Sequence, residues 1–371
     1  MATRAQLPSL EIEGYRAIRH LRIAKLGQVN LFVGKNNVGK TSLLEAIRLF
    51  ASRNAPTVMA QLFSEKFEYR SRFSVLRKDE GELAAEEYEA IAAGAEAFFH
   101  GSFSGPASAS IRIGLAGLKG DVLEITLPWT GSVRKNRSNQ KLLLDHFVAP
   151  ESPVFEIHRG NETASIPFDV MLRRIPIWPV RNRSRVLMIP ATGWGSDQLA
   201  RMWDIVAESG MAIAVERALR RILPDLERIH VIGESGLPAR GIRLALSSAS
   251  RPVPLSSLGD GINRVFGIAL ALVQTKGGVL LIDEVENGLH YTVQEEVWRA
   301  TMSLATELRV QVFATTHSWD CIQAFAIAAN DAVEVDGMLH RLEVSGRDTL
   351  RTVDMNEEDL SIVTRQRIEV R

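Results

Sequence analysis

The stretch GKNNVGKT, residues 34–41, constrains the fold of this chain more than any other feature. It satisfies the spacing G-x-x-x-x-G-K-[ST] in full, and it follows an apolar run at 28–33 that predicts a strand. After it, apolar side chains recur at helical spacing, which predicts a helix over 41–51. A glycine-rich loop between a strand and a helix is typical of a phosphate-binding loop.

The chemistry of phosphate binding accounts for the residue types of this loop. Gly34 and Gly39 allow backbone N–H groups to turn inward around phosphate oxygens, and the helix start adds the positive end of its dipole. Lys40 can reach the β- and γ-phosphates of a nucleotide, and the Thr41 hydroxyl can bind Mg²⁺. A chance glycine-rich turn with an exposed lysine is the alternative. The residues expected to contact the nucleotide are Gly34, Lys35, Asn36, Asn37, Val38, Gly39, Lys40, Thr41 and Ser42.

A second constraint lies in GGVLLIDEVENGLHY, residues 277–291. The continuous apolar run at 279–282 predicts a buried strand that ends on two adjacent carboxylates, Asp283 and Glu284. Parallel sheets bind ligands at the carboxyl ends of their strands, so Asp283 is expected to hold Mg²⁺ together with Thr41. Glu284 is expected to polarise the attacking water. Two solvated acids at a strand end are the alternative.

Two weaker features complete the predicted site. The sequence SLGDG at 257–261 places a hydroxyl and small residues before a predicted helix. Ser257 and Gly259 are therefore candidates for a second anion-binding helix start, although such residues also serve as ordinary N-caps. His317 follows a predicted strand at 310–314 and is a candidate contact for the γ-phosphate, with a purely structural histidine as the alternative.

The order of the predicted elements indicates an α/β fold. After residue 231, helices alternate with continuous apolar strands, which implies a mixed, largely parallel sheet covered on both faces. The middle of the chain contains two predicted strands at 109–129, and two predicted helices follow them. We expect residues 1–55 and 231–371 to share one core and residues 56–230 to form an inserted lobe of strands and helices.

Composition limits the classes of protein that fit this chain. Lys plus Arg and Asp plus Glu both number 44, so the net charge of zero does not indicate a nucleic-acid-binding protein. The single cysteine, Cys321, excludes an internal disulfide and favours a reducing compartment. The sequence shows no signal peptide and no apolar run of about 18 residues. We therefore expect a cytoplasmic protein with no membrane partner.

The motifs together carry a resemblance. The phosphate loop, the SLGDG stretch, the acidic strand end and the histidine occur in the order found in ABC-type P-loop ATPase heads. More narrowly, LFVGKNNVGKTSLLEAI, LIDEVENGLHY and VFATTHS resemble the stand-alone ATPases of the OLD (overcoming lysogenization defect) superfamily. That superfamily includes the ATPase subunit of the PARIS anti-phage defence system. The resemblance covers about 10–55 and 230–320.

The resemblance implies ATP and Mg²⁺ as cofactors and a role for each matching residue. Lys40 would bind phosphate, while Thr41 and Asp283 would bind the metal. Glu284 would be the catalytic base, and His317 would sense the γ-phosphate.

The same resemblance implies that Ser257 and Gly259 act on ATP bound to another copy of the chain. Three departures from ABC-type heads are visible. SLGDG differs from the serine–glycine–glycine–glutamine signature of transporters, and His290 stands where transporter heads carry an aspartate. The glutamine that links Mg²⁺ to the second lobe has no clear counterpart, and Gln61 is the candidate.

These implications predict an ATP-gated homodimer or higher homo-oligomer. Many OLD-superfamily proteins carry a Toprim nuclease, whose metal site needs an Asp-x-Asp pair that this chain lacks. We therefore expect an ATPase that is not itself a nuclease and that controls a separate Toprim-type effector in an anti-phage defence system. A RecF-like DNA-repair clamp is the alternative, because basic clusters at 134–137 and 173–185 could meet DNA phosphates.

Overall fold

The three-dimensional structure is a computed structural model that describes residues 6–66, 94, 96–101, 109–118, 120–127, 154–167, 185–233, 240–332, 335–346, 349–355 and 359. Its helices are α1 (Lys40–Ala51), α2 (Ala55–Lys66), α6 (Ser196–Glu208), α7 (Ala212–Arg220), η2 (Leu255–Leu258), α8 (Asp260–Gln274), α9 (Tyr291–Leu308) and α10 (Trp319–Asp331). Its strands are β1 (Leu10–Tyr15), β2 (Ile18–Ile23), β3 (Val29–Val33), β4 (Ala109–Gly114), β5 (Val122–Leu127), β6 (Val154–Arg159), β7 (Glu162–Pro167), β8 (Val186–Ile189), β9 (Leu226–Gly233), β10 (Arg240–Leu246), β11 (Val253–Pro254), β12 (Val279–Ile282), β13 (Gln311–Thr316), β14 (Gly337–Ser345) and β15 (Thr349–Met355).

A 6-stranded sheet with the order β15-β14-β3-β13-β12-β8 forms the centre of the fold. The five strands from β14 to β8 run parallel, and β15 pairs antiparallel with β14. Strand β3 is buried along its whole length because both faces of the sheet are covered. Leu31 faces one hydrophobic core and Phe32 faces the other. The predicted mixed, largely parallel sheet is confirmed.

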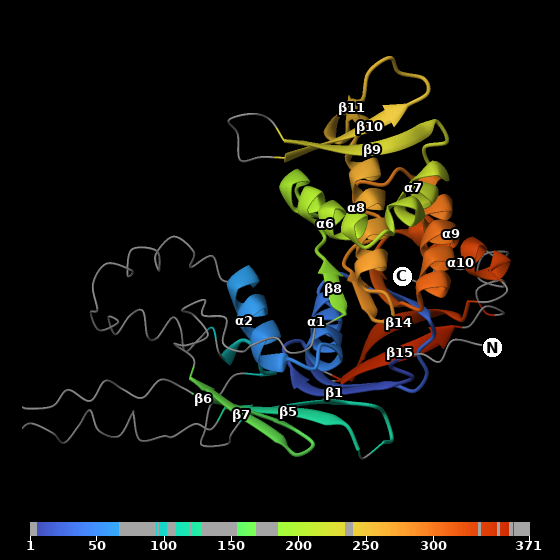
Figure 1. The fold of residues 1–371 in the computed structure, drawn as a ribbon. Helices are drawn as coiled ribbons and strands as arrows, with labels where there is room; N and C mark the ends of the chain where they lie inside the picture. Colours follow the sequence, from blue (N-terminus) through green and yellow to red (C-terminus); the bar gives the residue numbers. More distant parts are fainter. Residues whose placement is uncertain are drawn as a thin grey trace, which may run out of the picture.

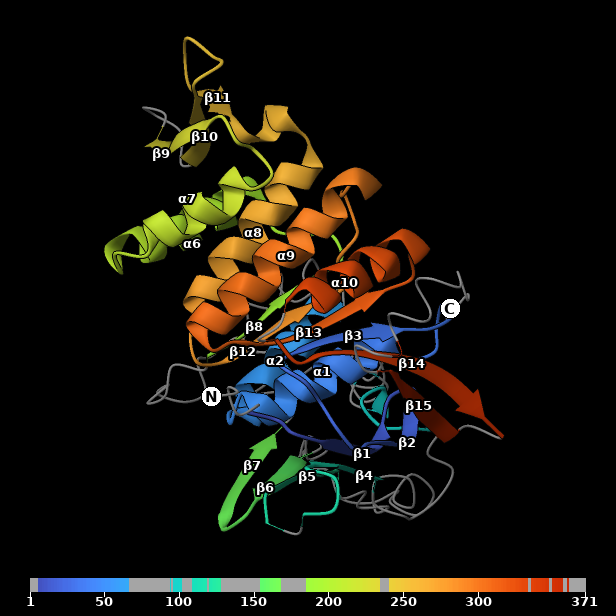
Figure 2. The same cartoon turned by 90° about the vertical axis from the view of Figure 1, so that its right-hand side faces the viewer.

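Helices α8, α9 and α10 cover one face of this sheet (Figure 2). They pack through apolar side chains, and the rings of Trp298 and Phe325 meet edge to face with centroids 4.9 Å apart. Helices α6 and α7 lie against the outer side of α8. Within the described ranges, no helix is both long enough and apolar enough to serve as a membrane span.

Helices α1 and α2 cover the other face and lie between the central sheet and an antiparallel sheet (Figure 2). The antiparallel sheet has the order β2-β1-β4-β5-β6-β7. Buried and exposed side chains alternate along its strands, as β4 shows. Ile111 and Ile113 enter the core, whereas Arg112 faces outward between Glu13 and Glu124 of the neighbouring strands. The two strands predicted at 109–129 are therefore confirmed as β4 and β5.

A third sheet, β11-β10-β9, lies beyond α6, α7 and α8 at the end of the molecule farthest from β1 (Figure 1). Ile229 of β9 and Leu244 of β10 are buried and join the same core as α8. The chain leaves this sheet through η2 and enters α8 at Asp260. The SLGDG stretch therefore stands at the start of a helix, as the sequence predicts.

Residues 56–230, predicted to form an inserted lobe, are interleaved with the rest of the chain. Strand β4 pairs with β1, and β8 pairs with β12. Strands from this segment thus belong to both large sheets. A division of the chain at 55 and 230 would therefore separate strands that are paired within the same sheet.

A buried histidine joins three neighbouring strands. His340 of β14 places Nδ1 2.8 Å from Asp354 Oδ1 on β15 and Nε2 3.3 Å from Asn30 Oδ1 on β3. Burial works to raise the pKa of Asp354, but the hydrogen bonds with His340 and Thr352 and the electrostatic interaction with His340 together outweigh that effect and leave the pKa lowered. The folded state therefore favours the ionised carboxylate.

The lowered pKa of Asp354 predicts how the free energy of unfolding depends on pH. The stabilisation from Asp354 is complete above the ordinary carboxyl range, about pH 4, and is lost as the pH falls through the lowered pKa. Asp354→Asn is expected to lower the free energy of unfolding at pH 7 by about 1 kcal/mol and to flatten its dependence on pH below about 5. Urea unfolding at a series of pH values measures both effects.

The matched control is Asp336→Asn, because Asp336 forms an exposed ion pair with Lys25 at 3.5 Å. Exposed pairs contribute little, so this variant is expected to follow the wild type at every pH. An Asp354→Asn variant with the same pH dependence as the wild type would contradict the assignment.

Candidate active site

The phosphate loop runs from the carboxyl end of β3 to the start of α1. Its two glycines adopt backbone conformations that other residues rarely reach, with φ of 150° at Gly34 and 105° at Gly39. A Cβ on Gly34 would also lie 2.9 Å from the carbonyl oxygen of Leu342. Gly39 is the N-cap of α1 and offers no side-chain acceptor. The first N–H groups of α1 are therefore suited to an anionic ligand.

Lys40 is buried at the start of α1, and its side chain folds over the loop. Nζ donates to the carbonyl oxygens of Gly34 at 2.7 Å and Lys35 at 3.1 Å. Burial lowers the pKa of Lys40, and the negative charges of the three carboxylates that follow β12 oppose that shift. A partly desolvated ammonium group in the middle of the loop gains from an anion such as phosphate.

The two predicted metal ligands lie side by side, although 242 positions separate them. Thr41 Oγ1 donates to Asp283 Oδ2 at 3.1 Å, and Thr315 Oγ1 donates to Asp283 Oδ1 at 2.6 Å. Parallel pairing brings Asp283 to this place, because Ile282 is level with Ala314. Hydroxyl and carboxylate oxygens are the ligands that Mg²⁺ prefers. Adjacent ligands of an octahedral Mg²⁺ stand about 3 Å apart. The residues therefore fit this ion.

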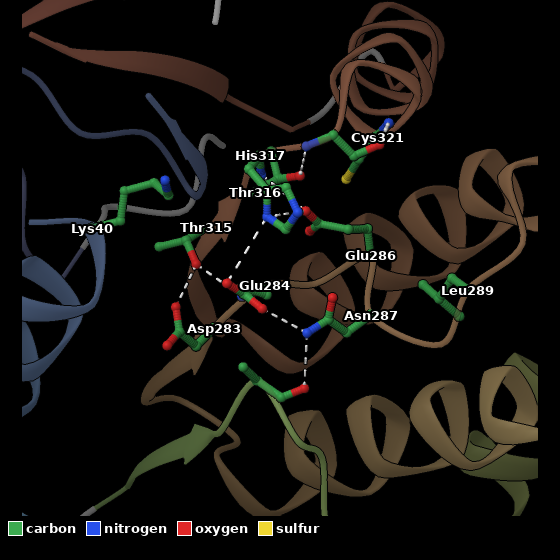
Figure 3. A network of polar contacts seen from close by, with 12 residues as sticks. Lys40, Asp283, Glu284, Glu286, Asn287, Leu289, Thr315, Thr316, His317 and Cys321 are labelled. Atoms are coloured by element: carbon green, nitrogen blue, oxygen red, sulfur yellow. Dashed lines mark hydrogen bonds and ion pairs between the residues drawn. The ribbon is translucent and has the colours of Figure 1, made fainter. Parts of the chain in front are cut away.

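Glu284 stands at the mouth of the site in an unusual backbone conformation. Its φ is 46°, in the left-handed region that residues other than glycine seldom adopt. The backbone N–H donates to Thr315 Oγ1 at 2.9 Å, and Asn287 Nδ2 donates to Glu284 Oε2 at 2.7 Å (Figure 3). The side chain is 38% exposed, so its carboxylate is fixed in direction and accessible to water.

His317 follows the end of β13 and lies close to Glu284. Its side chain is 47% exposed, and Nδ1 lies 3.9 Å from Glu284 Oε1. The same nitrogen lies 3.1 Å from Glu286 Oε1 (Figure 3). The structure therefore places His317 beside Glu284 and Glu286, and it places Asp283, the neighbour of Glu284, in contact with Thr41 of the phosphate loop.

Arg264 supports the strand end from behind, a role that sequence reasoning missed. Its Nη2 donates to the carbonyl oxygens of Asp283 at 2.6 Å and Glu284 at 2.9 Å, and its Nη1 donates to that of Pro190 at 2.7 Å. Burial lowers the pKa of Arg264, and the carboxylates of the site oppose that effect. Arg264 stands three positions after the SLGDG stretch, but its position in the sequence carries no sign that it reaches β12.

The end of β8 and the loop after it also contact the residues of the site, and the sequence did not predict these contacts. Asp283 N donates to the carbonyl oxygen of Ile189 at 2.9 Å. Asn287 Nδ2 also donates to the carbonyl oxygen of Ala191 at 3.2 Å. The short run VLMI at 186–189 was the available signal, because an apolar strand in a parallel sheet ends at the ligand-binding edge.

The signature-like residues belong to the turn before α8, close to β11. Ser257 is exposed, and its Oγ donates to the carbonyl oxygen of Pro254 at 2.7 Å. Gly259 has φ of 88°, and nothing lies within 4 Å of where its Cβ would be. Gln61, the candidate link to Mg²⁺, lies on α2, and its Oε1 accepts a hydrogen bond from Arg48 at 2.9 Å. Among the described contacts, none joins these residues to the metal ligands.

Two family models match parts of the chain. The model described as "AAA ATPase domain" matches residues 6–92, and the one described as "AAA domain, putative AbiEii toxin, Type IV TA system" matches residues 199–320. The first range contains the phosphate loop, and the second contains Asp283, Glu284 and His317. Both halves of the site are thus similar to AAA-type ATPase domains.

Curated relatives match over short segments. The chain is 33% identical over 85 residues to an "ATP/GTP phosphatase" of Helicobacter pylori. The aligned segment covers 22% of this chain and 23% of that protein. It is 48% identical over 46 residues to the "DNA replication and repair protein RecF" of Thioalkalivibrio sulfidiphilus, which covers 12% of this chain and 13% of that protein. The chain thus spans less than a quarter of the length of these relatives.

A solved structure has a similar fold. The Smc head bound to the C-winged helix domain of ScpA aligns over 95% of this chain and 99% of that chain, with a TM-score of 0.52 and 12% sequence identity. The fold is therefore that of an SMC-like, ABC-type ATPase head with mixed sheets, and the predicted fold class is confirmed.

Proposed function

We propose, from the fold of an ABC-type ATPase head, that this chain binds ATP with Mg²⁺ and hydrolyses it to ADP and phosphate. The observation that carries the proposal is the 3.1 Å contact between Thr41 Oγ1 of the phosphate loop and Asp283 Oδ2. Two merely solvated acids at a strand end would not require the phosphate loop as a neighbour. The AAA-type matches at 6–92 and 199–320 support the same activity.

Each residue of the site has a place in the proposed reaction. Lys40 and the N–H groups of the loop bind the β- and γ-phosphates. Thr41 and Asp283 would hold Mg²⁺, which when bound would supply positive charge beside the phosphate oxygens. Glu284 orients a water for attack on the γ-phosphorus and accepts its proton as ADP leaves. His317 contacts the γ-phosphate and thereby distinguishes ATP from ADP.

A second copy of the chain is expected to complete this site. Glu284 and His317 are open to solvent, with side chains 38% and 47% exposed. Ser257 and Gly259 offer a hydroxyl and a helix start, but among the described contacts of their own chain none reaches the phosphate loop. ATP would therefore be an interface ligand that favours the closed oligomer, and hydrolysis would remove the contacts that hold it closed.

Mixing two inactive variants tests the shared site. Lys40→Ala disables the phosphate loop of its own chain, and Ser257→Arg blocks the helix start that serves the other chain. Each variant alone is expected to lose nearly all ATPase activity. A mixed dimer keeps one intact site, so an equal mixture is expected to recover about a quarter of the wild-type rate. Phosphate release after mixing measures the recovery.

The control mixture combines either variant with a chain that carries both substitutions, because no dimer in that mixture has an intact site. It is expected to stay inactive. Failure of the first mixture to recover, with both proteins folded, would contradict a site shared between chains.

Within this class, we further propose a sensor or regulatory subunit of an anti-phage defence system that controls a separate Toprim-type nuclease. The motif resemblance to the OLD superfamily supports this role, and so does the lack of an Asp-x-Asp pair in the 371 residues. The matched Smc head has a ScpA domain bound to it, so a head of this fold can hold another protein. Copurification with such a nuclease would support the role, and copurification with replication proteins would contradict it.

A RecF-like DNA clamp is the second candidate, and it rests on the 46-residue match to RecF and on the basic clusters of the sequence. The predicted basic clusters of such a clamp lie at 134–137 and 173–185, and all of these residues except Arg185 lie outside the described part of the chain. A clamp would bind duplex DNA with an affinity that falls steeply between low and physiological salt, whereas an ATPase that acts on a protein partner would show no such binding.

A further inference from the structure

Glu286 is a buried carboxylate that touches His317 at two points. Its side chain is 7% exposed. Its Oε1 accepts a hydrogen bond from the backbone N–H of His317 at 2.9 Å and lies 3.1 Å from Nδ1 of the same residue. One oxygen atom therefore holds both the backbone and the ring of His317, which limits rotation of a side chain that is otherwise open to solvent.

The contacts of Nδ1 determine which ring nitrogen of His317 carries a proton. Nδ1 faces two carboxylate oxygens, Glu286 Oε1 at 3.1 Å and Glu284 Oε1 at 3.9 Å (Figure 3). Ionised carboxylates only accept hydrogen bonds, so a bare Nδ1 lone pair would be repelled by both. Nδ1 is therefore the donor to Glu286. Phosphate oxygens also only accept hydrogen bonds, so Nε2, the ring nitrogen left for the nucleotide, would carry a second proton when it donates to the γ-phosphate.

Glu286 suits this role better than Glu284. The Glu284 carboxylate accepts a hydrogen bond from Asn287 at 2.7 Å, and its side chain is 38% exposed. Glu286 is held in a tight turn, because Leu289 N donates to its carbonyl oxygen at 2.9 Å. The positive charges of Arg264 and Lys40 interact with its buried carboxylate. Its second oxygen, Oε2, has no hydrogen-bond partner among the described residues, so His317 is its principal hydrogen-bonding contact there.

We infer that Glu286 is a positioning residue that accepts a hydrogen bond from Nδ1–H of His317 and thereby turns the Nε2 edge of the ring toward the γ-phosphate. The inference rests on the proposed ATPase function, since His317 is the group that would touch the substrate. Glu286 itself acts only through the histidine. It differs from Glu284, which would act on the attacking water.

A double-mutant cycle tests whether Glu286 acts through His317. Glu286→Ala is expected to lower kcat by about 10- to 100-fold, the range seen when outer partners of metal-bound histidines are removed, with little change in KM for ATP. His317→Ala is expected to cost as much, and the double variant no more than His317→Ala alone. Glu286→Gln keeps an acceptor oxygen and is expected to restore part of the rate.

The matched control is Glu11→Gln, which alters another glutamate–histidine pair, Glu11 with His20 at 3.0 Å, on the antiparallel sheet. It is expected to leave kcat unchanged. A purely structural role for Glu286 predicts losses that multiply in the double variant, together with a large fall in the melting temperature. That outcome, or a Glu286→Ala variant as active as the wild type, would overturn the inference.

Nitrogen NMR of histidine-labelled protein tests the tautomer without any need for activity. The chain has 8 histidines, and loss of one signal in His317→Ala assigns the residue. The wild type is expected to show a protonated Nδ1 for His317, and Glu286→Ala a shift toward the Nε2–H tautomer. An Nε2–H tautomer in the wild type would refute the inference even if the protein hydrolyses ATP. A protonated Nδ1 in a protein without ATPase activity would instead refute the proposed function alone.

Discussion

Lys40→Ala is expected to weaken ATP binding by about a hundredfold or more, because each hydrogen bond to a charged group contributes about 1.5–3 kcal/mol and this ammonium group would contact two phosphates. The expectation follows from the partly desolvated position of Lys40, which makes an anionic ligand its best partner. Hydrolysis should fall at least as far. Calorimetric titration with MgATP measures the affinity, and phosphate release measures the rate.

Lys35→Ala is the matched control for this experiment. Lys35 lies in the same loop, where its backbone is expected to contact the nucleotide, but its side chain is exposed, and its contact with Lys40 is through the backbone carbonyl oxygen at 3.1 Å. Its removal is expected to change ATP affinity by less than about threefold, as for an exposed charge. Equal losses in the two variants would mean that net charge, and not the buried ammonium group, governs binding.

Glu284→Gln is expected to lower the rate of hydrolysis by about a thousandfold and to leave ATP binding nearly intact. A general base contributes about 10²- to 10⁴-fold, and glutamine cannot accept the proton of the attacking water. The amide can still take the place of the carboxylate beside Asn287, so the local structure should persist. Bound ATP would then accumulate and hold the oligomer closed.

Sedimentation with and without MgATP measures this closure. Glu284→Gln should form a larger species with MgATP, and ADP should not produce it. Glu295→Gln on α9, where Glu295 pairs with Arg299, serves as the control and should hydrolyse ATP at the wild-type rate. A Glu284→Gln variant that hydrolyses ATP normally would remove Glu284 from the mechanism, and one that binds ATP without association would argue against the shared site.

Sequence patterns anticipated the parts of the fold that local chemistry specifies. The strand β3, the phosphate loop and helix α1 follow from residues 28–51, because glycine conformations and helical periodicity act within a few positions. The buried strands β12 and β13 follow from unbroken apolar runs, and their carboxyl ends carry Asp283 and His317 as predicted.

The same patterns left the pairing of distant strands open. Strand β4 joins β1, and the four-residue strand β8 completes the edge beside β12. Neither pairing has a local signal, because which strand lies next to which depends on how the whole chain covers its apolar faces. The assignment of Gln61 met the same limit, since a residue that links metal to a neighbouring lobe is defined by its place in space.

Local sequence was therefore sufficient for the kind of chemistry: a phosphate loop with Lys40 and Thr41, a strand end with Asp283 and Glu284, and an α/β sheet to carry them. The tertiary fold was required for the contacts that make these residues a site, above all the support from Arg264 and the hold of Glu286 on His317. The physical reason is the separation along the chain over which each kind of interaction acts. Backbone sterics and periodic burial act over neighbouring residues, whereas these hydrogen bonds depend on strand register and helix packing between distant segments.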